Sequence, residues 1–219
     1  MHSDDSMVVL LTLGAYLIGS LSFAVIVSRL MGLDDPRTYG SQNPGATNVL
    51  RSGNKKAALA TLLLDALKGY FPVLLVKWYG PAFGLDDEAV AVVAMAAFVG
   101  HVWPVFFRFQ GGKGVATAAG ILFAVEPVLG AMVMGTWLLV AFVTRYSSLA
   151  ALMASVLSPG YYLFGNEVLW QTSAAELLTV MVMSLLLLWR HKENIGRLLR
   201  GQESKIGAKK EAAAADGAQ

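Results

Sequence analysis

The sequence of 219 residues contains no cysteine. Disulfides, thiolate metal sites and an acyl-thioester intermediate carried by the protein are therefore excluded. Charged residues are also scarce, at 15% of the chain, whereas hydrophobic residues make up 56% and the mean hydropathy is +0.57. Soluble domains carry about 25% charged residues, so we expect an all-α integral membrane protein. The net charge of +2 is too small to indicate nucleic acid as a partner.

Seven apolar runs are present, and we predict a membrane-spanning helix in each. They cover residues 7–31, 57–79, 89–107, 115–126, 128–144, 148–165 and 173–189. A helix needs about 20 apolar residues to cross the hydrocarbon core. The fourth run is shorter than this and is followed by Pro127. The fourth and fifth runs are therefore either two crossings or a tight hairpin or re-entrant pair.

The loops between these runs alternate in charge. Basic residues occur at 37–56, at 108–113, at 145 and after residue 189, whereas the intervening loops carry only acidic residues. By the positive-inside rule, the N-terminus lies outside and the C-terminus in the cytoplasm. This orientation requires an odd number of spans, as seven provides. We expect one membrane domain over residues 1–206 and a disordered cytoplasmic tail over 207–219.

The first cytoplasmic loop, residues 39–48, is rich in glycine and polar side chains. Gly40 and Gly45 permit positive φ angles and close backbone approach. Arg51 lies one helical turn after Thr47 and could bind an anion with two hydrogen bonds. The loop also offers hydroxyl and amide groups from Ser41, Asn43, Thr47 and Asn48. Alternatively, the loop is an ordinary polar turn in which Thr47 or Asn43 caps a helix.

The second cytoplasmic loop contains Lys113 flanked by Gly111, Gly112 and Gly114. Backbone N–H groups that converge beside a fixed positive charge are typical of a phosphate site. The loop is not a Walker A motif, because the leading glycine and the Ser or Thr after the Gly-Lys pair are missing, so nucleotide hydrolysis is not indicated. The alternative is a flexible interfacial loop with a snorkelling lysine.

Three further polar features lie in or next to the apolar runs. Asp65 and Lys68 share a helical face, either as a self-neutralising pair or as direct ligands. His101 is either a hydrogen-bonded structural residue or part of the site. His191 and Asn194 share a helical face just after the last run. A basic anchor on the cytoplasmic side explains the arginines and lysines there, but not specifically these two residues.

Together these motifs resemble the bacterial acyl-phosphate:glycerol-3-phosphate acyltransferases, the PlsY type. The likeness is carried by residues 19–20, 39–51, 65–69, 100–120 and 190–198, and it extends from about residue 14 to residue 203. Several separated motifs in one order are far more specific than either glycine loop alone. One departure is Gln42, where members more often have a small residue, and its side chain could narrow the pocket.

The resemblance implies transfer of a fatty acyl group from acyl phosphate to the 1-hydroxyl of sn-glycerol 3-phosphate. The products would be lysophosphatidate and inorganic phosphate, at the start of phospholipid synthesis in the bacterial inner membrane. It implies catalytic positions at Ser41, Lys113, His191 and Asn194. It also implies a substrate-binding set of Gly40, Asn43, Gly45, Thr47, Asn48, Arg51, Lys68, His101, Gly111, Gly112 and Gly114. Membrane lipids are the expected surroundings, no metal or cofactor is expected, and the oligomeric state stays open, a monomer included.

The route of the proton is a further hypothesis. The sequence has no His-x-x-x-x-Asp motif, since His101 is followed five residues later by Phe106 and His191 by Gly196. We therefore expect a donor phosphate oxygen to accept the proton of the glycerol hydroxyl, with Ser41 or His191 orienting the groups. A transporter of phosphorylated molecules and a non-catalytic scaffold are the rival functions. The short acidic outer loops disfavour an anion pathway, and a scaffold leaves Lys113 and the glycine loops unexplained.

Overall fold

The structure, a computed structural model, describes residues 3–207. Within that range the chain is helical, without a named strand. The helices are α1 (Ser3–Gly19), α2 (Phe23–Leu30), α3 (Ala46–Leu50), α4 (Lys55–Tyr79), η1 (Gly80–Phe83), α5 (Asp87–Val102), η2 (Val105–Phe107), α6 (Val115–Val125), α7 (Pro127–Thr144), α8 (Ser147–Phe164), α9 (Ala174–Arg190) and α10 (Lys192–Leu199). The tail expected over 207–219 lies, apart from Gly207, outside the described residues.

Each of the seven apolar runs forms helix, which confirms the all-α membrane fold. Four segments are long and apolar enough to cross a membrane alone: α4 with η1, α5 with η2, α7 and α8. Two bent pairs bring the candidates among the described residues to six. The α1–α2 pair bends by 45° and the α9–α10 pair by 56°.

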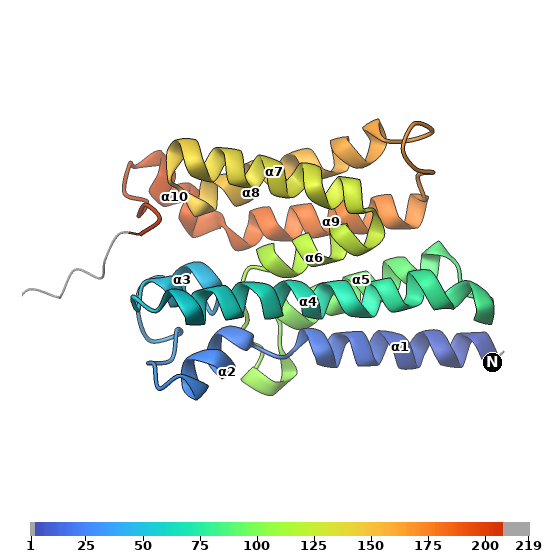
Figure 1. Cartoon of the computed structure of the whole chain (residues 1–219), viewed down its shortest axis with the longest axis horizontal. Helices are drawn as coiled ribbons and strands as arrows, with labels where there is room; N and C mark the ends of the chain where they lie inside the picture. Colours follow the sequence, from blue (N-terminus) through green and yellow to red (C-terminus); the bar gives the residue numbers. More distant parts are fainter. Residues whose placement is uncertain (1–2, 208–219) are drawn as a thin grey trace, which may run out of the picture.

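The remaining run forms α6, which is too short to cross. Its 11 residues span about 16 Å, against a hydrocarbon core of about 30 Å. Glu126 is the only residue between α6 and α7, and Pro127 occupies the first turn of α7. The tight-hairpin alternative for the fourth and fifth runs is therefore correct. In Figure 1, α6 begins about midway along the bundle, between α4 and α9.

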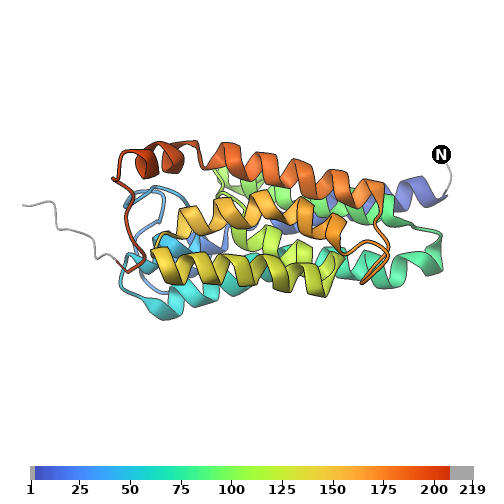
Figure 2. The same ribbon diagram turned by 90° about the horizontal axis from the view of Figure 1, so that it is seen from above.

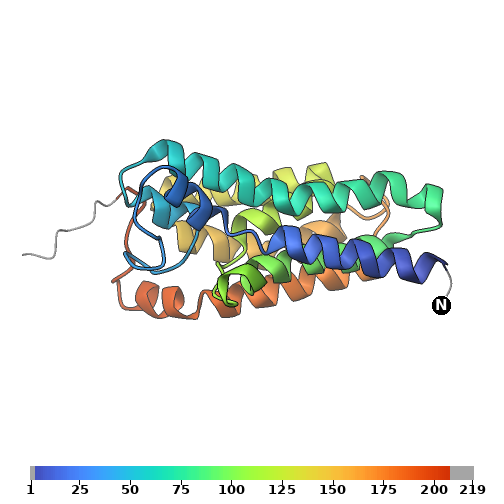
Figure 3. The same ribbon diagram turned by 90° about the horizontal axis from the view of Figure 1, so that it is seen from below.

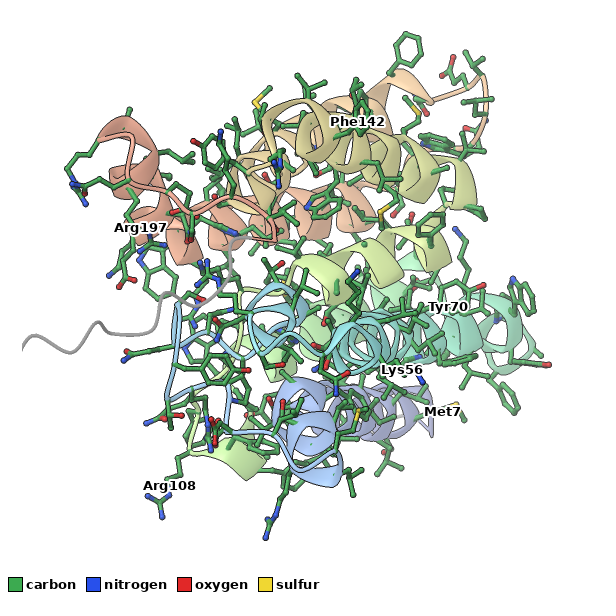
Figure 4. The ribbon with its side chains drawn as sticks, turned by 60° about the vertical axis from the view of Figure 1, so that its left-hand side comes forward. Met7, Lys56, Tyr70, Arg108, Phe142 and Arg197 are labelled. Atoms are coloured by element: carbon green, nitrogen blue, oxygen red, sulfur yellow. The ribbon has the colours of Figure 1, made fainter. Side chains whose placement is uncertain are left out.

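The bundle has two sides that meet around α6. On one side α1 packs against α5, and on the other α7 packs against α8 (Figure 1). The helix α6 packs closely on α4 because each helix carries a glycine where the two cross. A Cβ atom on Gly120 would clash with the Ala66 carbonyl, and a Cβ atom on Gly69 would clash with the Thr117 carbonyl. The outer surface is apolar, and Phe142 of α7, which is 85% exposed, lies on it (Figure 4).

All three ribbon views place α2, α3 and α10 at one end of the bundle and the N-terminus at the other (Figures 1, 2 and 3). We call the end that carries α2, α3 and α10 the site end. Local signals fix where several helices begin. The Asn54 side chain accepts a hydrogen bond of 3.0 Å from the Ala57 N–H at the start of α4, and Asp86 accepts one of 3.1 Å from the Glu88 N–H at the start of α5.

Candidate active site

Lys113 stands at the end of the glycine loop that leads into α6. Gly114 caps this helix with φ of 89°, a left-handed conformation that favours glycine. Gly112 is packed so closely against the His101 ring and the Pro44 carbonyl that a Cβ there would clash with both. The helix α6 begins about midway along the bundle (Figure 1), and Lys113, two residues before it, lines two cavities rather than standing at the edge of a full span, where the sequence had indicated it.

The Lys113 ammonium donates a hydrogen bond to Oδ1 of Asn194, in the first turn of α10. The Asn194 Nδ2 donates in turn to Glu203 Oε1 at 2.6 Å. That carboxylate also accepts hydrogen bonds from Ser148 at 2.7 Å and from Arg197 at 2.7 Å. Residues from α8, α10 and the segment after α10 therefore converge on the loop lysine.

Burial sets the electrostatics of this group of side chains. Burial, with the charge of the neighbouring Arg197 next in effect, lowers the pKa of Lys113 to about 8. Burial alone raises the pKa of Glu203, but hydrogen bonds from Ser148, Arg197 and Asn194 outweigh that effect, so the pKa lies below its ordinary value. Glu203 is thus a carboxylate at neutral pH, and Lys113 is a cation that deprotonates more easily than a free lysine.

The first loop is held in place by Asn48, which is buried. Its amide donates to the carbonyls of Pro36, at 2.6 Å, and Tyr39, at 3.1 Å, while its oxygen accepts from the Ser41 N–H. With both ends of its amide occupied by the loop backbone, Asn48 shapes the loop. Gly40 adopts a positive φ of 59° against the Asn48 side chain.

The expected capping of α3 by Thr47 or Asn43 is wrong. The helix begins after Gly45, and no side chain caps it. The Thr47 hydroxyl instead contacts that of Ser147 at 3.1 Å and so links α3 to α8 across the site end. Arg51 follows α3 and donates to Ser204 Oγ at 2.6 Å.

A buried polar network lies beneath the glycine loop. Asp65 and Lys68 form an ion pair of 2.7 Å with both side chains almost fully enclosed. Lys68 also donates to the Leu21 carbonyl at 2.6 Å, where the α1–α2 break leaves that oxygen free. The His101 Nδ1 lies 3.8 Å from Asp65 Oδ1 and 3.1 Å from the Thr117 hydroxyl. A carboxylate and a histidine therefore do meet here, although no short sequence motif joins them.

His191 lies at the bend between α9 and α10, and it is buried. Its Nδ1 is 2.8 Å from the Leu187 carbonyl. Because a carbonyl only accepts, Nδ1 carries the hydrogen of the neutral ring and Nε2 keeps its lone pair. His191 can therefore act as an acceptor or a base through Nε2.

Two cavities meet at these residues. The first, of about 250 Å³, has a polar end and an apolar depth. Its polar end is lined by Ser41, Asn43, Gly45, Thr47, Asn48, Arg51, His101, Lys113, Gly114, His191 and Asn194, and its depth by residues such as Leu122, Val133, Trp137, Val180, Met183 and Leu187. Leu62 and Leu138, both exposed on the outer surface, also line it. The first cavity therefore borders the surroundings of the bundle.

The second cavity, of about 260 Å³, is polar and strongly cationic. It is lined by Ser41, Gln42, Asn43, Gly111, Lys113, Trp189, Arg190, Lys192, Glu193 and Arg197. Arg197 extends from α10 at the site end, as Figure 4 shows. Gln42, the departure in the first loop, lies on its wall with φ of 54°. Ser41, Asn43 and Lys113 line both cavities, whereas Gly40, Lys68 and Gly112 line neither.

Sequence reasoning missed Glu203, Ser148, Ser204 and the structural role of Arg190. Glu203 and Ser204 fall in a polar stretch near the C-terminus, and they bond Ser148 and Arg51, which lie far away in the chain. The one available signal was that Glu203 is the lone acidic residue in the segment 197–205, which carries three basic residues. Arg190 was interpreted as part of a basic anchor, but its guanidinium bonds the glycine loop.

Comparison with known proteins agrees with this geometry. Residues 9–201 match the family described as glycerol-3-phosphate acyltransferase. The glycerol-3-phosphate acyltransferase of Paraburkholderia phytofirmans is 62% identical over 203 residues, which are 92% of this chain and 92% of the relative. That of Albidiferax ferrireducens is 59% identical over 198 residues, 90% of this chain and 88% of the relative.

Solved structures match as well. The crystal structure of PlsY (YgiH), an integral membrane glycerol 3-phosphate acyltransferase, in its glycerol 3-phosphate form aligns with a TM-score of 0.84 and 37% identity over 92% of this chain and 96% of that one. Its lysophosphatidic acid form aligns with a TM-score of 0.79 and 38% identity, and the alignment covers 91% of this chain and 95% of that one. The chain belongs to the PlsY family of integral membrane glycerol-3-phosphate acyltransferases.

Proposed function

We propose that this protein transfers a fatty acyl group from acyl phosphate to the 1-hydroxyl of sn-glycerol 3-phosphate, giving lysophosphatidate and inorganic phosphate. The observation that carries the proposal is that Lys113 lines both cavities, one apolar in its depth and one polar and cationic. An acyl phosphate has an apolar chain and an anionic head, and glycerol 3-phosphate is small and anionic. The two cavities have the chemistry of these two ligands and meet at one lysine.

We assign the donor to the first cavity. Its acyl chain would lie among the apolar residues of the depth, and its phosphate at the polar end. There Lys113 and Arg51 supply positive charge, and the N-terminus of α6 adds its own dipole through Val115 and Ala116, which also line the cavity. The exposed Leu62 and Leu138 on its border support entry of the chain from the bilayer.

We assign the acceptor to the second cavity. Lys192 and Arg197 suit the phosphate of glycerol 3-phosphate, and the shared residues Ser41 and Asn43 lie toward the donor. Alignment of two bound reactants can contribute about 7–11 kcal/mol to lowering the barrier. The comparisons support this acceptor, since a solved relative is described in glycerol 3-phosphate and lysophosphatidic acid forms.

In the reaction, the glycerol hydroxyl oxygen attacks the acyl carbonyl carbon, and the bond from that carbon to the phosphate oxygen breaks. Phosphate leaves with negative charge, which Lys113 and the adjacent N–H groups stabilise. The hydroxyl proton passes to an oxygen of the leaving phosphate. Ser41, and His191 through its Nε2, orient the reacting groups, and Asn194 holds Lys113 toward the cavities.

The cellular setting belongs to the same proposal. The alternation of basic and acidic loops favours a bacterial inner-membrane location, with the N-terminus outside and the site end in the cytoplasm. The short α6 does not conflict with this orientation, because the start of α1 and α10 lie at opposite ends of the bundle (Figure 1). This orientation gives a water-soluble phosphate ester direct access to the second cavity. Membrane lipids are the surroundings, and the reaction as written requires no metal, cofactor or nucleic acid.

The test is phosphate release by purified protein in detergent or lipid, with palmitoyl phosphate and glycerol 3-phosphate and no added metal. We expect release that requires both substrates, lysophosphatidate as the second product, and loss of both in Lys113→Ala. Palmitoyl-coenzyme A in a parallel reaction separates the donor classes. Transfer from the thioester but not from acyl phosphate would overturn the donor assignment, and binding of glycerol 3-phosphate without any transfer would favour a transporter.

A further inference from the structure

Arg190, the last residue of α9, reaches across to the glycine loop. Its Nη2 donates to the Gly111 carbonyl at 3.0 Å and to the Gly112 carbonyl at 3.1 Å. These are the hydrogen bonds that its side chain makes within residues 3–207, and its buried Nε has no acceptor in that range. One guanidinium thus holds two successive peptide carbonyls of the loop that carries Lys113.

This contact fixes the orientation of the loop peptides. In a trans peptide the carbonyl and the following N–H point in opposite directions. The Gly112 carbonyl faces Arg190, so the Lys113 N–H faces away from it. On the other side of the loop, the Gly112 N–H donates to the His101 carbonyl at 3.2 Å. The loop is therefore held between α5 and α9, and among the described residues the N–H groups of Lys113 and Gly114 have no acceptor.

The contact also joins two parts of the candidate site. Arg190 directly precedes His191, and Asn194 follows one turn later and accepts a hydrogen bond from Lys113. Anchoring the glycine loop to the end of α9 therefore sets the position of Lys113 relative to both residues. Without the contact, the loop would keep its bond to α5 and lose its link to α9.

We propose that Arg190 is a positioning residue for the acyl transfer, which clamps the Gly111–Gly112 carbonyls and thereby places Lys113 between the two substrates. The proposal rests on the proposed function. The simpler role for Arg190 is that of one positive charge among several on the wall of the second cavity. Substitution by lysine separates the two roles. Lysine keeps the positive charge, but its ammonium ends one bond short of the position of Nη2, which makes both bonds to the loop, and it is not held by a rigid guanidinium plane.

The experiment compares Arg190→Lys and Arg190→Gln with Arg200→Lys. Arg200 is a matched control because it follows α10 at the same end, its side chain bonds Gln202 alone among residues 3–207, and it lines neither cavity. We expect both Arg190 variants to lose about tenfold or more in kcat/KM, with a fall in kcat and higher KM for both substrates, because Lys113 serves both. Arg200→Lys should match the wild type.

Full rescue by Arg190→Lys would overturn the proposal, because charge alone would then suffice. A rise in the KM of glycerol 3-phosphate with unchanged kcat would also overturn the proposal. That result would show that Arg190 contributes only a positive charge on the wall of the second cavity. Activity is normalised to the protein that remains folded in a thermal scan, so a variant that is merely unstable but fully active when folded counts against the clamp.

A second measurement does not depend on the acyl donor. Calorimetric binding of glycerol 3-phosphate to Arg190→Lys, Lys113→Ala and the double variant tests whether Arg190 acts through Lys113. We expect the losses of affinity to be non-additive, so that the second substitution weakens binding little once the first is present. Additive losses would overturn the proposal. If the wild type binds glycerol 3-phosphate but transfers nothing from acyl phosphate, the donor assignment fails while the clamp is still tested.

Discussion

Glu203 Oε1 lies 2.6 Å from Asn194 Nδ2, and this contact determines which way the Asn194 amide points. A carboxylate only accepts hydrogen bonds and an ammonium only donates them. Asn194 must therefore turn its NH2 group toward Glu203 and its oxygen toward Lys113. A residue from the segment after α10 thus controls the contact that holds the lysine shared by both cavities.

Replacing Glu203 with glutamine should disturb this arrangement. The glutamine amide accepts hydrogen bonds at one end only, so its NH2 group must face either Asn194 and Ser148, which share Oε1, or Arg197, which bonds Oε2. We expect a loss of about ten- to a hundredfold in kcat/KM, the range for hydrogen bonds that involve a charged group. Phosphate release measures it, with Glu167→Gln, in an exposed turn between α8 and α9, as control. Wild-type activity in Glu203→Gln would contradict this role.

The pH dependence of phosphate binding should follow Lys113. Burial, with Arg197 next in effect, lowers its pKa to about 8. The ammonium is charged below that pKa, and a phosphate monoester is already a dianion above pH 7. Affinity for glycerol 3-phosphate should therefore be level from pH 7 to about 8 and fall by up to about tenfold per unit above it.

Lys113→Arg is the control for this profile, because arginine stays charged throughout the range. Its affinity should be lower at pH 7 but level up to pH 10. Calorimetric titrations at each pH give both curves. A wild-type affinity that does not change between pH 7 and 10 would show that the charge on Lys113 is not needed.

The buried Asp65–Lys68 pair should behave as a unit. Lys68→Met leaves the Asp65 carboxylate enclosed without its partner and removes the bond to the Leu21 carbonyl. We expect a cost of about 3–5 kcal/mol in the free energy of unfolding. Asp65→Asn combined with Lys68→Met should cost less than the sum of the single changes. Thermal unfolding in detergent measures all three variants, and additive losses would argue against the pairing.

Close packing of α4 on α6 should be sensitive to one methyl group. Gly120→Ala places a Cβ against the Ala66 carbonyl, and overpacking of this kind costs about 1–3 kcal/mol. Gly135→Ala in α7 is the matched control, since nothing lies within 4 Å of its Cβ position. We expect a lower Tm for Gly120→Ala and an unchanged or slightly higher Tm for Gly135→Ala. Equal Tm values would mean that α6 moves freely on α4.

Local patterns predicted the helices and the Asp65–Lys68 pair, because both depend on neighbours in the chain. Continuous apolar runs specify helix in a membrane, and a spacing of three places two side chains on one face. The glycines around Lys113 similarly indicated a loop with exposed backbone. In these cases the residues that determine the structure lie within a few positions of one another.

Contacts between distant segments could not be predicted in this way. The Asp65–His101 approach depends on how α4 meets α5, and the Glu203–Ser148 bond depends on how the segment after α10 folds back onto α8. Asn48 was predicted as a ligand, and no sequence signal indicated that its amide also bonds the backbone of its own loop. Apolar hydropathy alone also gave no sign that α6 would start inside the bundle, since a short run can be a span or half of a hairpin.

The shortness of α6 has a consequence for two substrates that prefer different solvents. Because the helix starts partway along the bundle, the loop before it lies deeper inside the bundle than the other loops at the site end (Figure 1). With the substrates assigned as proposed above, a water-soluble alcohol reaches that depth through the cationic second cavity, while a fatty chain enters sideways past Leu62 and Leu138. Neither reactant has to leave its own phase before the new ester bond forms.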